Sequence, residues 1–443
     1  MISEHSKLRP NRQLRQNVQR WLAVRASNLE LLRHRPFTVL LAARTLNMLG
    51  FSFEPVALAF GILQLTGNDK TFLSLVLVAQ TFPEVLLALF GGVIADRLPR
   101  VWVLRVGQSV NFVSWASMGV LMLLDVRSLW AYCSLAVLGG IASSVIYPAL
   151  TGIIPEVTPP QFLQQGNSWL AMGMSIAKLF GLIAAGAVVA FLGGGVAMVI
   201  AGSVYFCGVV LTMLLPPLPA PAGTSESMLK QLAAGWGEFR SRQWLWVTIL
   251  SFSVIVMMLE AAHGVLGPYL SETELGGPQA WAKVLAGEAS GAIIGVLVSF
   301  LWRPSRPIFA GVMLLLFWAF PTTLLGLSAP LWSAVLAMFC AGFGNQIFSV
   351  QWATTLQTQV PPDRLSRVAA YDAFGSICLG PLGLIIAAPV SSLIGIHQTM
   401  IACGVVMFIA TAATLCAPGV RAVRATARVA SIDGKLLTTD EPA

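Results

Sequence analysis

The chain has 443 residues, of which 56% are hydrophobic and only 10% are charged, and its formal net charge is +8. A soluble globular protein carries roughly a quarter charged residues, so this composition indicates a membrane protein. The basic balance alone does not indicate nucleic-acid binding, because the position of the basic residues along the chain decides its meaning.

The chain begins with a polar and basic segment, residues 1–36. Hydrophobic residues recur in it near helical spacing, with arginines between them. This pattern fits either an amphipathic helix on an anionic membrane surface or a solvated basic tail. Nothing in the segment resembles a cleavable signal peptide.

Twelve apolar segments follow, each long enough to cross the hydrocarbon core of a bilayer as a helix. They cover residues 37–64, 72–95, 102–124, 129–153, 166–192, 195–215, 243–270, 279–301, 308–327, 331–357, 366–394 and 398–417. The alternation typical of a membrane β-barrel does not recur between turns. The sequence therefore predicts an all-α membrane protein with twelve transmembrane helices.

The lysines and arginines fall in alternate loops. The chain has 27 lysines and arginines. If the N-terminus lies in the cytosol, all of them fall in cytosolic segments except Arg44, Lys70, Arg127, Lys178 and Lys283. Cytosolic loops carry the excess of basic residues in membrane proteins. We therefore expect a multi-pass protein of the inner membrane with both termini in the cytoplasm, and no nucleic-acid partner.

The spans divide six and six around a proline-rich connection at 216–242. An internal repeat supports this division: PPQFLQQGNSWLAMG at 159–173 aligns with PPDRLSRVAAYDAFG at 361–375, and each copy begins the fifth span of its half. Two parallel six-helix repeats form one large transporter fold. The predicted parts are a cytosolic segment 1–36, a bundle 37–215, a cytosolic linker 216–242, a bundle 243–418 and a cytosolic tail 419–443.

The loop between the second and third spans reads GGVIADRLPR, residues 91–100. It resembles the signature loop of the major facilitator superfamily, G-x-x-x-D-R-x-G-R-[RK]. The matching residues are Gly92, Asp96, Arg97 and Arg100, whereas Pro99 and Val101 depart from the pattern. An ordinary cytosolic loop would explain the arginines but not the acid.

The resemblance implies two pseudo-symmetric six-helix bundles and a conformational switch. In such a switch, Asp96 meets the N-terminus of the eleventh span, near Arg364, only when the cytosolic side is closed. The corresponding loop of the second half, WRPSRP at 302–307, has Trp302 in the place of Asp96. The switch is therefore expected to be asymmetric.

Further stretches favour one branch of the superfamily. LTGNDK at 65–70, Arg44 within the first span and PPDRLSR at 361–367 are similar to the branch that contains macrolide-efflux proteins and enterobactin exporters. Two departures from the motifs of proton-driven drug antiporters leave an importer of the same fold as the alternative: Leu182 replaces the proline of the fifth-span antiporter motif, and Ala136 replaces a fourth-span arginine.

Small residues form two ladders at helical spacing. In the fifth span, which keeps Gly181 and Gly186 of the antiporter motif, the ladder is Ala177, Gly181 and Ala185. In the eighth span it is Gly287, Gly291 and Gly295. Such ladders allow helix backbones to approach closely. We expect the two ladders to face each other across the interface between the bundles, with ordinary tight packing as the alternative.

Charges inside the spans are the candidates for proton coupling. Each costs about 2.5–3.5 kcal/mol on the insertion scale unless it is partnered. The acidic candidates are Glu54, Glu84, Glu260 and Asp372. The alternatives are exposure at the external mouth for Glu54 and Glu260, and a static pairing of Asp372 with Arg97 or Arg44.

Five further residues are candidates for the substrate cavity. They are Arg44, Lys178, Trp115, Trp169 and Trp352. Lys178 lies deep in the fifth span, where it meets either a cavity carboxylate or an anionic group of the substrate. The alternative for the aromatic residues is contact with lipid or the interface.

The chain lacks the phosphate-binding loop of ATPases and the zinc and serine-hydrolase motifs. We therefore predict no enzyme, no cofactor and no metal. The sequence predicts a monomeric secondary transporter that exports an amphipathic small molecule, such as a drug or a siderophore-like metabolite, in exchange for protons across the bilayer. The alternatives are a proton-coupled importer of the same fold and a non-transporting membrane receptor or assembly protein.

Overall fold

A computed structural model describes residues 31–159, 162–216, 236–237, 239–302 and 304–425. Within these ranges, some side chains lie outside the description: those of residues 88–97, 147–148, 151–152, 155, 163–165, 168, 300, 357, 362–367 and 369–370. The expectations for residues 1–30, for most of the linker and for the tail beyond residue 425 likewise lie outside it.

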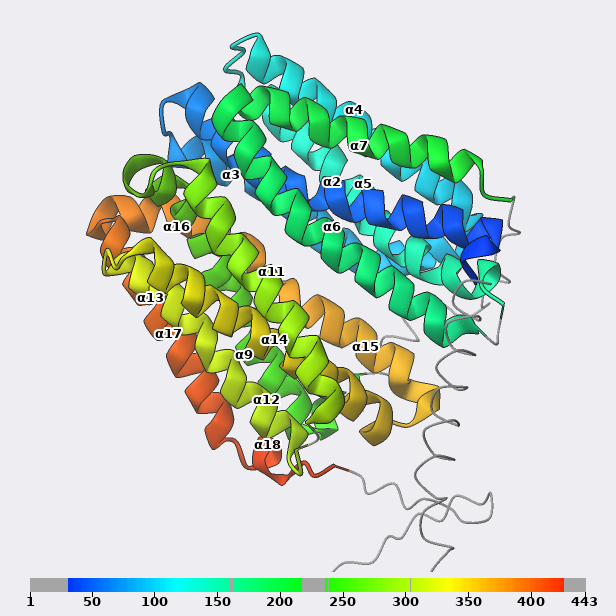
Figure 1. The fold of residues 1–443 in the computed structure, drawn as a ribbon. Coiled ribbons are helices and arrows are strands. Elements are labelled where there is room, and N and C mark those ends of the chain that lie inside the picture. The colour runs from blue at the N-terminus through cyan, green and yellow to red at the C-terminus, as the bar shows by residue number, and fades with distance from the viewer. Residues whose placement is uncertain (1–30, 160–161, 217–235, 238, 303, 426–443) are drawn as a thin grey trace, which may run out of the picture. The chain divides into compact units, whose positions relative to one another are not determined.

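The described residues form helices and short turns, with no strand among them (Figure 1). The helices of the first half are α2 Arg35–Thr66, α3 Lys70–Arg97, α4 Arg100–Leu123, α5 Leu129–Val157, α6 Leu163–Leu192 and α7 Gly194–Met213. Those of the second half are α9 Gln243–Leu259, η2 Glu260–Leu266, α10 Gly267–Leu270, η3 Ser271–Leu275, α11 Pro278–Leu301, α12 Pro307–Leu315, η4 Leu316–Trp318, α13 Ala319–Gly326, α14 Leu331–Gln359, α15 Pro362–Ile377, α16 Gly380–Ile394, α17 Ile396–Cys416 and α18 Pro418–Ala422.

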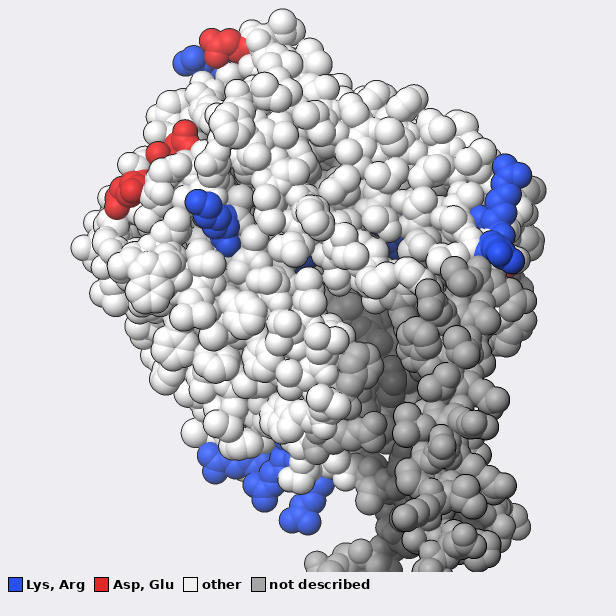
Figure 2. Space-filling model, viewed as in Figure 1, with Lys and Arg blue, Asp and Glu red and all other residues white. Residues whose placement is uncertain are grey.

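Twelve of the described helical segments are long and apolar enough to cross a membrane. Most of the described surface in Figure 2 is uncharged, as a lipid-facing protein requires. The predicted all-α fold with twelve transmembrane helices is confirmed.

Single glycines join the last two spans of each half. Gly193 separates α6 from α7 with φ 85° and ψ 163°, and Gly395 separates α16 from α17 with φ 91° and ψ 156°. Only glycine adopts such a conformation without strain. The same glycine turn in the same place of both halves is a second sign of the internal repeat.

The chain packs into two compact units. The first contains Met1–Ser225, Glu260–Ala286 and Pro381–Leu393, and the second contains Glu226–Leu259, Gly287–Gly380 and Ile394–Ala443. The units are defined by packing, so the bundle boundaries drawn from the repeat stay a prediction.

Two spans are interrupted where the chain passes from one unit to the other. The seventh span changes from α9 to the π-helical turn η2 at Glu260, and the eleventh breaks between α15 and α16. Pro381 lies in the first turn of α16, where it lacks an N–H group for the preceding turn. Pro268 follows η2 and removes a donor in the same way. Hydropathy predicts both spans but neither interruption.

In the first unit, helices approach each other at glycines. A Cβ on Gly194 of α7 would lie 2.1 Å from the Cα of Gly61 in α2, and one on Gly140 of α5 would lie 2.0 Å from the carbonyl oxygen of Gln80 in α3. A side chain at either position would push the helices apart. The tight packing of α3 on α5 positions part of the candidate site described below.

Segments of the seventh, eighth and eleventh spans pack against the first-half helices within this unit. Ser74 Oγ donates a hydrogen bond to the carbonyl oxygen of Leu384, and Lys70 Nζ lies 5.6 Å from the centre of the Tyr269 ring. Ser74 and Lys70 lie near the start of α3, so both contacts are made at this end of the helices. Under the predicted orientation it is the outer end.

Candidate functional site

Three glutamates from three different spans come together in the first unit. Glu54 is on α2, Glu84 is on α3, and Glu260 is the first residue of η2. The charge of Glu84 interacts with those of both Glu54 and Glu260. Neighbouring carboxyl groups in an apolar interior titrate as a coupled set, so the proton-coupling role of this cluster stays a prediction that its geometry favours.

Glu54 is the most enclosed member of the cluster, with only 3% of the residue exposed. One carboxylate oxygen accepts a hydrogen bond from the side-chain amide of Gln80, and the other accepts one from the Tyr205 hydroxyl at 3.4 Å. The alternative of exposure at an external mouth is therefore wrong for Glu54. Glu84 and Glu260 are partly exposed.

Gln80 and Tyr205 are site residues that the sequence did not reveal. Both side chains are uncharged, so neither stands out in an apolar span. Gln80 precedes Glu84 by four residues on α3, which places both on one helix face. That spacing was the available signal. The Tyr205 ring on α7 packs against Gly50 of α2, where a Cβ would lie 3.1 Å from it.

Asp372 lies in the second unit, on α15. Its Oδ2 accepts a hydrogen bond from Trp352 Nε1 at 2.8 Å, and its Oδ1 accepts one from the Ser376 hydroxyl at 3.4 Å. Two neutral groups of its own unit thus hold Asp372. The side chain of Arg97 lies outside the description, so the alternative of a pairing with Arg97 or Arg44 stays untested. Two predicted residues, Asp372 and Trp352, are brought together here.

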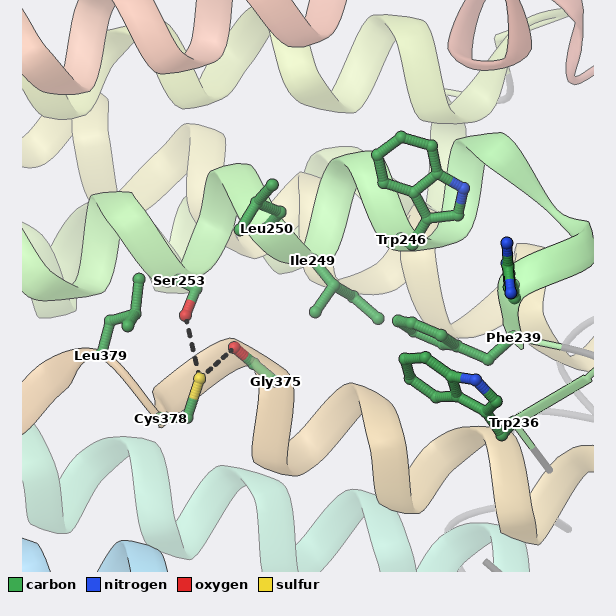
Figure 3. A pocket seen from close by; sticks show the side chains of 10 residues that line it. Trp236, Phe239, Trp246, Ile249, Leu250, Ser253, Gly375, Cys378 and Leu379 are labelled. Carbon is green, nitrogen blue, oxygen red and sulfur yellow. Dashed lines mark hydrogen bonds between the residues drawn. The ribbon is translucent and has the colours of Figure 1, made fainter. Parts of the chain in front are cut away.

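A cleft of about 540 Å³ lies between α9 and α15 in the same unit (Figure 3). Trp236 and Phe239 lie at one end of it, and at the other end Cys378 Sγ lies 3.4 Å from the Ser253 hydroxyl. The rings of Trp236, Phe239 and Tyr371 pack on one another at centroid distances of 5.5 to 5.6 Å. Arg240 also lines the cleft and is the one cation among its described lining residues. The cleft has the size and apolar walls of a small-molecule site.

The structure places Trp115 in the apolar core and Trp169 at the edge of that core. Trp115 is fully buried, with its ring 2.5 Å from the position of a Cβ on Gly139. Trp169 packs on the core formed by α2, α4 and α5. Neither residue is among the described lining residues of the cleft in Figure 3, and their place in a substrate cavity stays a prediction.

Arg44 and Lys178 lie on α2 and α6 of the first unit. Arg44 is 8% exposed, and its Nε lies 3.2 Å from the sulfur of Met174 on α6. Lys178 is half-buried, one turn beyond Met174 on the same helix. The structure does not describe a cavity at either residue, and their role in a substrate cavity stays a prediction.

The two glycine ladders do not face each other as predicted. The backbone of α14 packs on the eighth-span ladder within the second unit: a Cβ on Gly287, Gly291 or Gly295 would lie 1.9 to 2.7 Å from a carbonyl oxygen of α14. In the fifth span, Gly181 lies against Ser52 of α2. Gly186 meets Ala282, in the first turns of α11. A stripe of small residues shows which face packs closely, but not which helix it packs against.

Only part of the predicted switch loop is described. Arg100 Nη1 forms an ion pair with Glu156 Oε1 at 2.7 Å, which joins the start of α4 to the end of α5. The contacts of Gly92, Asp96 and Arg97 lie outside the description. Pro99 caps α4 with φ −56°, a value that proline adopts without strain. Glu156, missed from the sequence, is an acid at the cytosolic end of the predicted fourth span.

Several curated relatives resemble most of the chain. The enterobactin exporter EntS of Shigella boydii serotype 4 (strain Sb227) is 28% identical over 396 residues, which covers 85% of this chain and 91% of that protein. EntS of Escherichia coli O81 (strain ED1a) has the same identity and coverage. These relatives are efflux transporters by name.

Solved structures and a family model agree on the fold. The nucleoside transporter NupG matches with a TM-score of 0.66 and 12% identity, over 85% of this chain and 98% of that one. A bacterial homologue of the iron transporter ferroportin in an inward-facing state matches with a TM-score of 0.67 and 17% identity, over 87% of this chain and 100% of that one. The family model described as Major Facilitator Superfamily matches residues 40–381. The chain therefore belongs to the major facilitator superfamily of membrane transporters.

Proposed function

We propose that this transporter exports an amphipathic small organic molecule in exchange for protons. The observation that carries the proposal is the cluster of Glu54, Glu84 and Glu260, in which three spans bring carboxyl groups together in an apolar unit. An ionisable group inside a membrane protein marks an ion or substrate path. The cluster is the proposed proton carrier.

The relatives and the cleft of the second unit support the kind of substrate. Curated relatives at 28% identity are named enterobactin exporters, which favours a siderophore-like molecule. The cleft lined by Trp236, Phe239 and Leu250 offers about 540 Å³ with mostly apolar walls. Such a volume suits an amphipathic molecule of drug size. A drug and a secreted metabolite both fit this description.

The proposed setting is the inner membrane, with both termini in the cytoplasm and the protein acting as a monomer. The distribution of basic residues supports this orientation. Alternating access would then expose the site to each side in turn by rocking of the two six-helix bundles. The loop residues Gly92, Asp96, Arg97 and Arg100 are proposed to stabilise the state that is closed to the cytoplasm.

Everted membrane vesicles test the direction and the coupling. An inside-acid proton gradient is imposed, and accumulation of two probes, enterobactin and the amphipathic dye ethidium, is measured with the wild type and with Glu54→Gln. We expect gradient-dependent accumulation of at least one probe by the wild type and its loss in Glu54→Gln, because glutamine keeps the size of the side chain but not its proton. Glu274→Gln, at an exposed position, is the matched control.

Three outcomes would contradict the proposal. Wild-type accumulation that persists after the gradient is collapsed would exclude proton coupling. Gradient-driven uptake in whole cells, with none in everted vesicles, would favour the importer. Equal accumulation by the wild type and Glu54→Gln would exclude the glutamate as a carrier.

A further inference from the structure

A second, smaller cavity of about 170 Å³ lies in the second unit, where α9, α14 and α15 meet. Its lining includes Thr248 and Phe252 of α9, Phe348 and Trp352 of α14, and Asp372 and Ser376 of α15. It shares Ile249 with the larger cleft of Figure 3, so the two cavities adjoin the same side chain.

One side of this cavity is aromatic. Phe252 and Phe348 stack with their centroids 5.9 Å apart and their planes at 20°, and Phe348 stacks on Trp352 at 5.7 Å and 29°. Aromatic faces attract a cation within about 6 Å of the ring centre, and tryptophan does so most strongly. The walls therefore favour an organic cation over an anion.

The other side of the cavity carries the carboxylate of Asp372. Its partners among the described residues are the neutral Trp352 indole and the neutral Ser376 hydroxyl. A carboxylate has about four sites for accepting hydrogen bonds, so two bonds leave room for a further donor. An ammonium group supplies N–H donors for the carboxylate and also carries the opposite charge.

Thr248 gives an independent sign that a ligand is missing. The residue is 2% exposed and lines the cavity, and its hydroxyl has no hydrogen-bond partner among the described residues. Buried hydroxyls are satisfied in nearly all native proteins, because an unmade hydrogen bond destabilises the fold. A bound ligand with a polar group beside the aromatic walls would satisfy it.

We propose that this pocket binds the ammonium end of an aromatic organic cation, with the charge at Asp372 and the ring against Phe348 and Trp352. An engineered cavity of about 150 Å³ binds benzene, so a cavity of 170 Å³ holds one ring. The inference rests on the proposed function, since the pocket is the head-group subsite of the exported molecule and the apolar cleft beyond Ile249 takes its body.

Binding of three small probes tests the charge preference. The full-length protein in nanodiscs is titrated with benzylammonium, benzyl alcohol and benzoate, and binding is followed by calorimetry against empty nanodiscs. We expect benzylammonium to bind at least about tenfold more tightly than the other two, because only it completes the charge pair. Equal binding of the neutral or the anionic probe would overturn the proposal.

Two substitutions locate the probe. Asp372→Asn keeps an acceptor for Trp352, and we expect it to weaken benzylammonium binding by about tenfold or more. Thr248→Val removes the unpartnered hydroxyl, and we expect a several-fold loss. Thr411→Val is the matched control, because Thr411 is also buried but already donates to the carbonyl oxygen of Met407. Unchanged binding in Asp372→Asn would place the cation elsewhere.

The glutamate cluster separates this proposal from the proposed function. Glu54→Gln is expected to bind benzylammonium as the wild type does while failing to export. Selective binding of benzylammonium by a wild type that shows no proton-driven transport would support the proposed pocket and contradict the proposed export function. Proton-driven export by a wild type that does not bind benzylammonium selectively at Asp372 would support the export function and contradict the proposed pocket.

Discussion

Glu54 shows how a charge is accommodated inside an apolar helix bundle. Two donors from two other helices, Gln80 and Tyr205, reach its carboxylate oxygens, and glycines make room for both. Gly140 lets the backbone of Gln80 approach α5, and Gly50 accepts the Tyr205 ring. The arrangement is preorganised, since rigid helices and not loops hold every member.

Removing the Tyr205 hydroxyl tests whether this arrangement matters for transport. Tyr205→Phe keeps the ring packed on Gly50 but removes one donor to Glu54. We expect the free energy of unfolding to fall by only about 1 kcal/mol, the net value of one hydrogen bond. We expect a clear change in the dependence of transport on pH. The Tyr205 hydroxyl stabilises the ionised and the protonated forms of Glu54 to different extents, so its loss changes the balance between them.

The measurements are thermal or denaturant unfolding in detergent and probe accumulation in everted vesicles across a range of pH. Tyr269→Phe serves as the control, because its ring contacts Lys70 through the π face, which phenylalanine retains. A Tyr205→Phe profile identical to that of the wild type would show that the hydroxyl has no part in proton binding.

At the scale of helices, the eighth span illustrates what a small-residue ladder does. At Gly287, Gly291 and Gly295, carbonyl oxygens of α14 approach α11 so closely that a Cβ on the glycine would collide with them. The ladder therefore fixes one helix pair inside the second unit. It does not face the fifth-span ladder as predicted.

Gly291→Ala tests this packing. The added Cβ would lie 1.9 Å from the carbonyl oxygen of Phe339, a backbone atom that moves only with the helix. We expect a destabilisation of about 1–3 kcal/mol, typical of overpacking, despite the better helix propensity of alanine. Gly237→Ala is the control, because no atom lies within 4 Å of the added Cβ there. Equal thermal stability of the two variants would contradict the close approach of α11 and α14.

The helices and the glutamates of the site differ in how far the sequence predicts them. Span number follows from the length of each apolar run, and the glutamates follow from the expense of a charge in such a run. The break before Pro381 escaped because hydropathy is continuous across it, and the partner of the Gly291 ladder escaped because spacing defines a face and not a neighbour. Gln80 is uncharged and the Thr248 hydroxyl is a common group in membrane spans, so neither stands out in the sequence. Their roles follow only from the way the helices pack.

For the whole molecule, the first unit contains pieces of both halves of the sequence. Residues 260–286 and 381–393 pack with α2 to α7, and both the seventh and eleventh spans are interrupted where they enter this unit. In a transporter that works by alternating access, such packing at one end belongs to one state and must be released in the other. The interruptions are suitable points for that release, because fewer helical hydrogen bonds resist bending there.

A reversible cross-link tests whether this end opens during transport. Ser74 of α3 and Leu384 of α16 are in contact through a hydrogen bond, so Ser74→Cys and Leu384→Cys are combined and joined by a short bifunctional thiosulfonate reagent. We expect the cross-link to stop transport and a reductant to restore it, because α3 and α16 must separate once per cycle. The single variants, treated identically, control for the native cysteines. Full transport by cross-linked protein would show that these two helices stay together throughout the cycle, and that the opening occurs along another pair.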